Sequence, residues 1–135
     1  MQRDAVGELL KNMGSSCREL VLSRYTHALS KIVDSVAEYE LGIVAAKLYA
    51  LSNPARLRIL RLLCTVREGL PLCLIAAVLG KTMQFTSYHI KVLKECGLVE
   101  EVSHGSFKLY KVNREAVDQL LNELKRLVEL EQVSQ

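Results

Sequence analysis

Apolar residues recur at steps of three and four along most of this 135-residue chain, which predicts a mainly helical protein. A short helix is predicted over residues 4–12, ended by the segment "MGSS", in which Ser16 can cap the next helix. The helical pattern of residues 17–51 fits either one long helix or two helices with a break near Asp34. Residues 114–131 are predicted to form a last helix with a wide apolar stripe.

A helix with clear start signals is predicted after residue 52. Asn53 can cap it, and Pro54 occupies the first helical position, where its missing N–H costs nothing. Gly69 ends the segment. The inner face is predicted to hold Leu57, Leu60, Leu63 and Cys64, and three arginines are expected elsewhere on the helix, Arg56, Arg58 and Arg61.

Two further helices follow, and a tight turn joins them to each other. "LPLCLIAAVLG" predicts a short apolar helix ended by Gly80, and Thr82 can cap the next helix, which runs to about Cys96. Gly97 supplies the left-handed stop. Thr86, Ile90 and Leu93 are predicted to share the buried face, with His89 beside them ordering the turn through a hydrogen bond. The opposite stripe is predicted to hold Gln84, Ser87, Tyr88, Lys91 and Lys94.

The segment "LVEEVSHGSFKLYKV" predicts a β-hairpin of about five residues per strand, with Gly105 in its turn. Helix, short helix, tight turn, helix, hairpin, helix is the order of a winged helix-turn-helix, so the predicted fold is mainly α with a small β-hairpin. In that fold the second helix of the pair enters the major groove of DNA. The predicted DNA contacts are Thr82, Gln84, Ser87, Tyr88, Lys91, Lys94, His104, Lys108 and Lys111.

Charge is concentrated in the middle of the chain. Residues 53–113 carry nine Lys/Arg against four Asp/Glu, whereas residues 1–52 are neutral and residues 114–135 are acidic. This balance fits a polyanionic partner for the middle segment. The chain has no run of about 18 apolar residues and no signal-peptide core at its start, so we expect no membrane span and a cytoplasmic location. The expected division is a helical arm over 1–40, the winged helix-turn-helix over 41–131 and a tail over 132–135.

Three pieces of the chain resemble, in order and at matching spacing, the ArsR/SmtB family of transcriptional repressors. These are "ALSNPARLRIL", "SYHIKVLKECGLV" and "SHGSFKLYKV", within a resemblance that runs from about Ala45 to about Leu130. The resemblance implies a homodimer built on the first and last helices, binding to a double-stranded DNA operator, and release on a signal. The residues expected at the dimer interface are Val36, Tyr39, Ile43, Val117, Leu120, Leu121, Leu124, Leu127 and Val128.

The four cysteines are scattered without a Cys-x-x-Cys pair, so they are expected to be reduced thiols. The family's thiolate metal site keeps one cysteine here, in "PLCL", and the last helix has no histidine for the family's second site. We therefore expect no metal and no cofactor, with Cys17 and Cys73 as the candidates for an improvised site. Cys64 is the redox candidate, although its place on the predicted apolar face favours a buried hydrophobe.

The main hypothesis is therefore a sequence-specific DNA-binding repressor. One alternative is a thiol- or metal-responsive sensor of the same type, using Cys64, Cys73 or Cys17, and another is a winged-helix module that binds proteins instead of DNA. An enzyme using Cys96 or Cys73 with His89 is not expected, because a third orienting group and a glycine-rich oxyanion loop are missing. Salt separates the DNA-binding hypotheses from the protein-binding module, because phosphate-driven binding falls steeply with ionic strength.

Overall fold

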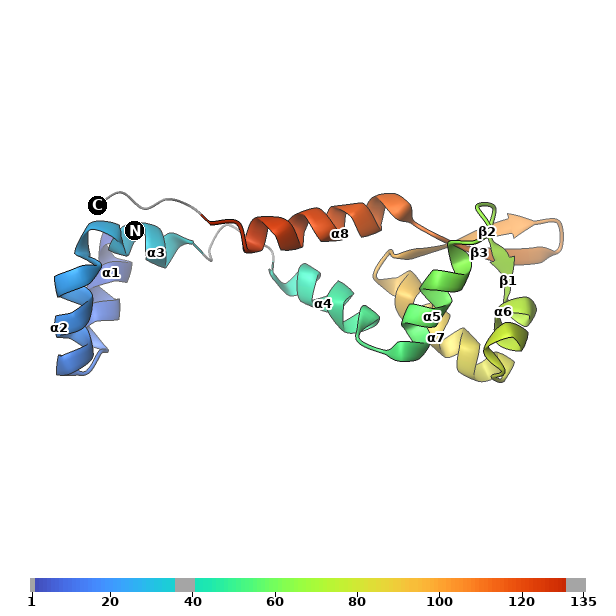
Figure 1. The fold of residues 1–135 in the computed structure, drawn as a ribbon, viewed down its shortest axis with the longest axis horizontal. Helices are drawn as coiled ribbons and strands as arrows, with labels where there is room; N and C mark the ends of the chain where they lie inside the picture. The colour runs from blue at the N-terminus through green and yellow to red at the C-terminus, as the bar shows by residue number, and fades with distance from the viewer. Residues whose placement is uncertain (1, 36–40, 131–135) are drawn as a thin grey trace. The chain divides into compact units, whose positions relative to one another are not determined.

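The computed structural model describes residues 2–35 and 41–130, which belong to two compact units. One unit comprises residues 1–40 and 129–135, and the other comprises Leu41–Val128. In the first unit, α1 and α3 lie in contact (Figure 1). Its elements are α1 (Gln2–Lys11), α2 (Ser15–Arg24), the 3₁₀ turn η1 (Thr26–Ala28) and α3 (Leu29–Asp34).

The first unit confirms the short N-terminal helix and corrects its surroundings. Helix α2 begins at Ser15, directly after Gly14, so the expected cap by Ser16 is wrong. The pattern of residues 17–51 is broken further than predicted, because α2 ends at Arg24 and a 3₁₀ turn follows Tyr25. Helix α3 ends at Asp34, where the sequence allowed a break. Residues 36–40, with the expected dimer residues Val36 and Tyr39, lie outside the described residues.

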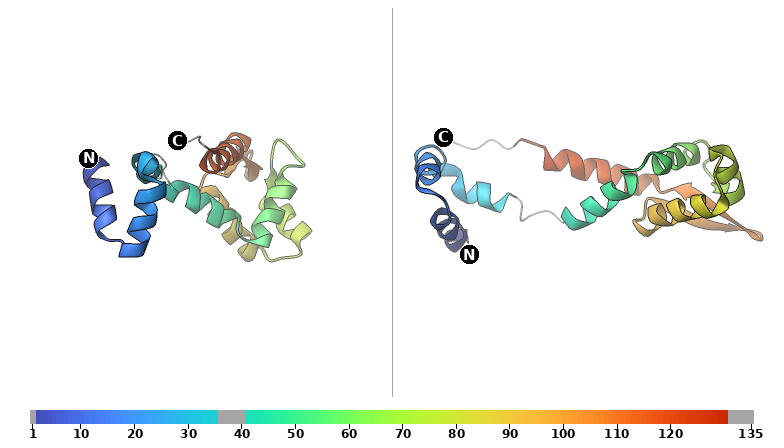
Figure 2. Two further views of the ribbon diagram at one scale, coloured as in Figure 1. Left: turned by 60° about the vertical axis from the view of Figure 1, so that its left-hand side comes forward. Right: turned by 90° about the horizontal axis from the view of Figure 1, so that it is seen from below.

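The Leu41–Val128 unit has the element order of a winged helix-turn-helix (Figures 1 and 2). Its core is made by side chains from α4, α5, β1, α6, α7 and the start of the hairpin, and the hairpin extends past the helices as a wing. The helices are α4 (Leu41–Leu51), α5 (Pro54–Leu63), α6 (Leu72–Leu79), α7 (Met83–Glu95) and α8 (Arg114–Leu127), and the strands are β1 (Leu70–Pro71), β2 (Val99–His104) and β3 (Phe107–Val112).

Helix α5 starts as predicted but turns a different face inward. The Asn53 side chain accepts hydrogen bonds from the backbone N–H groups of Ala55, at 2.8 Å, and Arg56, at 3.3 Å. Ile59 and Leu63 are fully buried, whereas Leu57 and Cys64 are exposed, so the predicted inner face is wrong for those two residues. Arg56 is also buried, contrary to its expected outward position.

The helix-turn-helix corner follows the local signals of the sequence. Gly80 has φ of 67° and Gly97 has φ of 82°, the left-handed conformation that glycine adopts without strain. The Thr82 side chain accepts a hydrogen bond from the Phe85 N–H at 3.0 Å and caps α7. The predicted buried face of α7 is confirmed by the burial of Thr86, Ile90 and Leu93.

The wing is the hairpin of β2 and β3, with six residues in each strand instead of about five. Its register pairs Val99 with Val112 and His104 with Phe107, leaving Gly105 and Ser106 as the turn. The sequence missed β1, which pairs Leu70 with Tyr110 and makes β3 the central strand of three. A strand of two residues that includes a proline carries no periodic signal.

Helix α8 begins as predicted and ends earlier. The Asn113 side chain accepts a hydrogen bond from the Ala116 N–H at 3.1 Å, and the helix ends at Leu127 instead of residue 131. Within residues 2–35 and 41–130, no helix is long and apolar enough to cross a membrane.

Candidate nucleic-acid interface

Helix α7 presents a polar, basic stripe on the side away from the core. Its buried side chains fix the rotation of the helix about its own axis, and the side chains of the opposite stripe are exposed as predicted. The preceding corner is closed by a hydrogen bond from the Lys81 N–H to the Ala76 carbonyl at 3.0 Å. The exposed stripe consists of Gln84, Ser87, Tyr88, Lys91 and Lys94.

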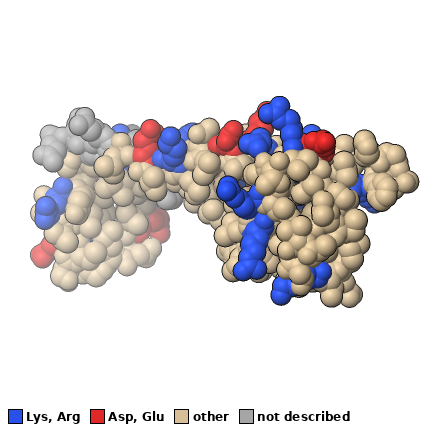
Figure 3. All heavy atoms as spheres, turned by 45° about the vertical axis from the view of Figure 1, so that its right-hand side comes forward, with Lys and Arg blue, Asp and Glu red and all other residues tan. Residues whose placement is uncertain are grey.

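Lys and Arg side chains are more prominent than acidic ones on one face of the Leu41–Val128 unit. Figure 3 shows Lys and Arg side chains in a band across the visible face of the Leu41–Val128 unit, with acidic side chains along its upper rim. A band of one sign raises the local concentration of a polyanion and speeds its encounter with the protein.

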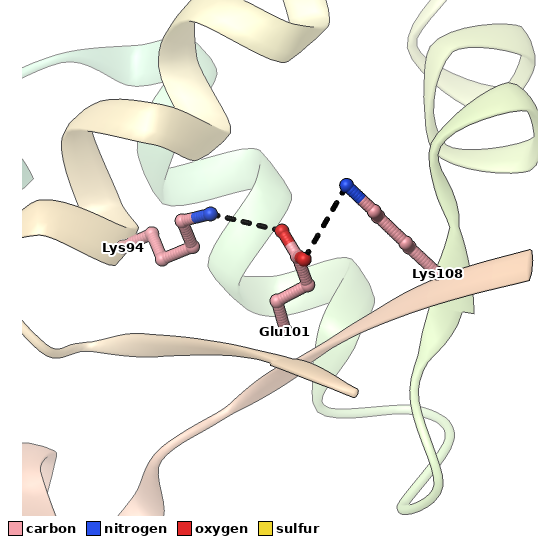
Figure 4. A network of polar contacts seen from close by, with 3 residues as sticks. All are labelled: Lys94, Glu101 and Lys108. Atoms are coloured by element: carbon pink, nitrogen blue, oxygen red, sulfur yellow. Dashed lines mark hydrogen bonds and ion pairs between the residues drawn. The ribbon is translucent and has the colours of Figure 1, made fainter. Parts of the chain in front are cut away.

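Three of the predicted DNA-contacting lysines form ion pairs within the chain, and Figure 4 shows the two that share Glu101. Lys94 Nζ donates to Glu101 Oε1 at 2.8 Å, and Lys108 Nζ lies 3.6 Å from Glu101 Oε2. Lys111 Nζ lies 4.0 Å from Glu100 Oε1. The hydrogen bond from Lys94 holds the pKa of the Glu101 carboxyl below its usual range and raises the pKa of Lys94. Both groups are therefore charged at neutral pH.

The wing tip carries a predicted contact and an aromatic neighbour. His104 is exposed at the end of β2, and the cross-strand residue Phe107 is exposed beside it. The sequence singled out His104 and missed Phe107, although a large apolar side chain two residues after the turn glycine was a visible signal.

A buried polar pair joins α5 to α7, and the sequence missed it. Arg56 is 5% exposed and His89 is 7% exposed. Arg56 Nε donates to the backbone carbonyl of Ala50 at 2.6 Å, and Arg56 Nη1 lies 3.0 Å from His89 Nδ1. The expected hydrogen bond of His89 therefore exists, but its partner comes from α5 instead of the local turn. The position of Arg56 three residues before Ile59 and seven before Leu63 was the signal that could have placed it inward.

Aromatic rings of α7 and α4 lie around this pair. The Phe85 ring packs edge-on against the His89 ring at 4.5 Å between centroids, and the Tyr88 ring does so at 5.1 Å. The Arg56 guanidinium lies 5.8 Å from the centre of the Tyr49 ring at the end of α4. The pair thus connects α4, α5 and α7.

Protonation of His89 is expected to destabilise the folded unit. Burial, and then the positive charge of Arg56, lower the pKa of His89 below its ordinary value of about 6.5. Below about pH 6.5, His89 is protonated in the unfolded chain but stays neutral in the folded chain. The free energy of unfolding therefore falls as pH drops from about 6.5 toward the lowered pKa. Above about pH 6.5 this loss is absent.

Urea unfolding of the wild type and of His89→Gln at neutral and mildly acidic pH measures the effect. Because glutamine does not titrate, the wild type should lose more stability on acidification than the variant. Equal losses in the two proteins would contradict a lowered pKa at His89.

The cysteines are more accessible than the sequence predicted. Cys17, Cys64 and Cys73 are exposed and Cys96 is half-buried, so the expectation of a buried Cys64 is wrong. The reason is that α5 turns Ile59 and Leu63 inward, which places Cys64 at its exposed C-terminal end. Across the two described ranges, no group of three or more His, Cys, Asp or Glu side chains lies close enough to hold a metal ion.

The residues expected at a dimer interface divide into two groups. Leu120 is buried within its own chain, Val117 packs against the core and Leu124 is half-buried. Ile43, Leu121, Leu127 and Val128 are exposed. The sequence missed three further exposed apolar residues of α4, Leu41, Leu48 and Tyr49.

Comparison with known proteins places this geometry among regulators of transcription. Residues 51–102 match the family model described as a helix-turn-helix domain. The chain is 32% identical over 77 residues to the arsenical resistance operon repressor of Bacillus subtilis (strain 168). The aligned residues make up 57% of this chain and 72% of the repressor.

Two solved structures share the fold over about two thirds of this chain. An ArsR-like transcriptional regulator from Rhodococcus sp. RHA1 is similar with a TM-score of 0.59 and 26% identity, over 64% of this chain and 80% of that one. A homodimeric winged helix-turn-helix DNA-binding domain from Mycobacterium bovis, a possible ArsR-family transcriptional regulator, is similar with a TM-score of 0.55 and 28% identity. That similarity covers 70% of this chain and 90% of the other.

Proposed function

The chain belongs to the ArsR family of winged helix-turn-helix transcriptional regulators, and from this premise we propose that it represses transcription by binding a double-stranded DNA operator as a homodimer. The observation that carries the proposal is the exposed polar stripe of α7, held outward by the buried face of the same helix. A helix of this kind fits the major groove and reads base edges there.

The roles of the stripe residues follow from their chemistry. We assign base contacts to Gln84 and Ser87, whose side chains both donate and accept hydrogen bonds in the first turns of α7. We assign a sugar or base-stacking contact to Tyr88. Contacts to phosphates set the register of the helix on the duplex without reading sequence. They are assigned to Thr82, Lys91, Lys94, His104, Lys108 and Lys111.

The dimer is proposed from the exposed apolar residues of α4 and α8. These two helices contact each other within the Leu41–Val128 unit, and both keep large apolar side chains in solvent. The related domain from Mycobacterium bovis is homodimeric. A two-fold pair would present its two α7 helices to half-sites about 34 Å apart, one turn of duplex.

Release of the operator by a thiol-directed signal is a second candidate function. The exposure of Cys64, Cys73 and Cys17 favours it, because reactive thiols must be accessible. Binding to the chain's own promoter, measured with reductant, with oxidant and with zinc, cadmium and arsenite, tests this candidate together with the metal-responsive one. No change under any condition would leave the repressor without either signal.

Catalysis is not proposed. His89, the base of the considered Cys/His enzyme, is buried and engaged with Arg56. The similar proteins named above are regulators of transcription.

Salt dependence of DNA binding tests the proposal, with Lys91→Ala as the diagnostic variant. Wild-type affinity for promoter DNA should fall about a thousandfold between about 50 and 200 mM salt. Lys91→Ala should bind every sequence more weakly and lower the steepness of the salt dependence by about one unit. Fluorescence anisotropy on promoter and unrelated duplexes measures both quantities.

Lys11→Ala is the matched control, because Lys11 is an exposed lysine in the last turn of α1, outside the helix-turn-helix, the wing and the proposed dimer helices. It should bind DNA like the wild type. If Lys91→Ala and Lys11→Ala behave alike, Lys91 does not contact phosphate. If the affinity for DNA hardly responds to salt, phosphate contacts do not drive binding, which contradicts the proposal.

A further inference from the structure

We propose that the carboxylate of Glu101 occupies the place of a DNA phosphate between Lys94 and Lys108, and so limits the affinity of the free protein for DNA of any sequence. The proposal rests on the DNA-binding function proposed above and concerns the same surface. It assigns a role to an acidic residue that the sequence did not single out.

The register of the hairpin shows which way Glu101 faces. Glu101 pairs with Tyr110 across the strands, and Tyr110 packs against the core. Side chains directly opposite one another share a face of the sheet, so Glu101 lies on the face turned toward the helices. Lys108, two residues before Tyr110 on β3, projects from that same face.

Lys94 approaches this face of the wing from the last turn of α7. Figure 4 shows the three side chains converging from α7, β2 and β3, with the carboxylate in the middle. One carboxylate oxygen contacts Lys94 at 2.8 Å and the other contacts Lys108 at 3.6 Å. Lys94, Glu101 and Lys108 therefore lie in the corner between α7 and the wing.

The arrangement has the chemistry of a phosphate site with an internal ligand. A backbone phosphate has two free oxygens and one negative charge, and a carboxylate presents the same two oxygens and the same charge. Two lysines with Glu101 between them carry a net charge of one, whereas the lysines alone would carry two. A glutamate carboxylate is charged throughout the neutral range, and the lowered pKa of Glu101 extends that range to more acidic pH, so it competes with phosphate at neutral pH.

The displacement that DNA requires is feasible because these ion pairs are solvent-exposed. Such pairs contribute little to stability and exchange partners readily. When α7 enters the major groove, a DNA phosphate must replace Glu101 as the partner of the two lysine ammonium groups. The phosphate is also repelled by the Glu101 carboxylate, which has the same charge. Because phosphate contacts carry no sequence information, this cost falls equally on operator and on bulk DNA.

Comparison of Glu101→Gln with Glu100→Gln tests the proposal. Both variants add one unit of net charge to the same strand, but Glu100 is paired with Lys111, at 4.0 Å, and lies on the other face of the hairpin. Glu101→Gln should bind promoter and unrelated duplexes about fivefold more tightly at low salt. Its salt dependence should be steeper by about one unit. Glu100→Gln should change affinity by less.

A second variant separates competition between Glu101 and DNA phosphate from the general effect of net charge on affinity. Lys94→Gln should cost little affinity in the wild type, where Glu101 already holds the lysine, and more in the Glu101→Gln background. Thermal unfolding of each variant checks that the fold is kept.

Three outcomes would overturn the proposal. They are equal gains for Glu101→Gln and Glu100→Gln, unchanged or weaker binding by Glu101→Gln, and an equal cost of Lys94→Gln in both backgrounds. If the wild type binds no duplex even at low salt, the proposed function fails as well, and that result is distinct from the other three.

Discussion

Replacing Ile43 and Leu121 together by glutamate is expected to give a monomer that binds operator DNA about a hundredfold more weakly. Ile43 is 52% exposed on α4 and Leu121 is 53% exposed on α8, so each can become charged without disturbing the folded chain. In the proposed dimer the same side chains would be buried, and an unpaired carboxylate there is costly.

The loss of affinity follows from the geometry of two linked half-sites. In a dimer the second α7 binds at a high effective concentration once the first has bound, and a monomer loses that advantage without losing any contact of its own. Sedimentation equilibrium measures the oligomeric state, and anisotropy on full-length and half-length operators measures affinity. The variant should bind the two lengths almost equally, whereas the wild type should strongly prefer the full operator.

Leu57→Glu is the matched control for this variant. Leu57 is an exposed leucine of α5, so its replacement introduces one carboxylate of the same kind outside α4 and α8. It should leave the oligomeric state unchanged. A double variant that stays dimeric would show that α4 and α8 do not form the interface, and the helix pair would then need another explanation for its exposed apolar surface.

The helix-turn-helix and the wing were predictable because their signals are local. Thr82 caps α7, Gly80 and Gly97 end their helices in the left-handed conformation, and Gly105 turns the hairpin, each through bonds within a few residues. The alternation of Thr86, Ile90 and Leu93 with polar positions then fixes which side of α7 is exposed. Nothing distant along the chain is needed for any of these assignments.

Features that depend on distant partners were missed or misplaced. In α5, the series 57, 60, 64 and the series 56, 59, 63 both have helical spacing, and only the packing of the neighbouring helices selects the second. The buried contact of Arg56 with His89 joins residues 33 positions apart. The pairing of β1 with β3 requires the hairpin to be in place before two residues can be recognised as a strand.

In the candidate DNA site, too, features with local signals were predictable and features that depend on distant partners were not. The exposed stripe of α7 could be read from periodicity, but the capture of Lys94 and Lys108 by Glu101 requires the wing to fold back toward the end of α7. Counting charges along the sequence treats these lysines as free cations. The fold shows that their charge is partly offset before any DNA arrives.

Arg56→Met is expected to reduce the free energy of unfolding by about 3 kcal/mol, because it leaves two buried acceptors without donors. These are the backbone carbonyl of Ala50 at the end of α4 and Nδ1 of His89 on α7. Methionine keeps most of the aliphatic stem of arginine, so the loss reports mainly on hydrogen bonding and less on packing. A loss of that size lowers the melting temperature of a unit this small by roughly 15 °C.

The double variant Arg56→Met/His89→Leu decides whether the pair itself accounts for the loss. Replacing both partners of a buried hydrogen bond by apolar groups removes the unpaired acceptor on His89, so the double variant should be more stable than Arg56→Met alone. Urea unfolding of the wild type, the two single variants and the double variant gives the coupling between the residues. If the double variant loses the sum of the two single losses, Arg56 and His89 act independently, and α7 is oriented by its apolar contacts with the core instead of by this pair.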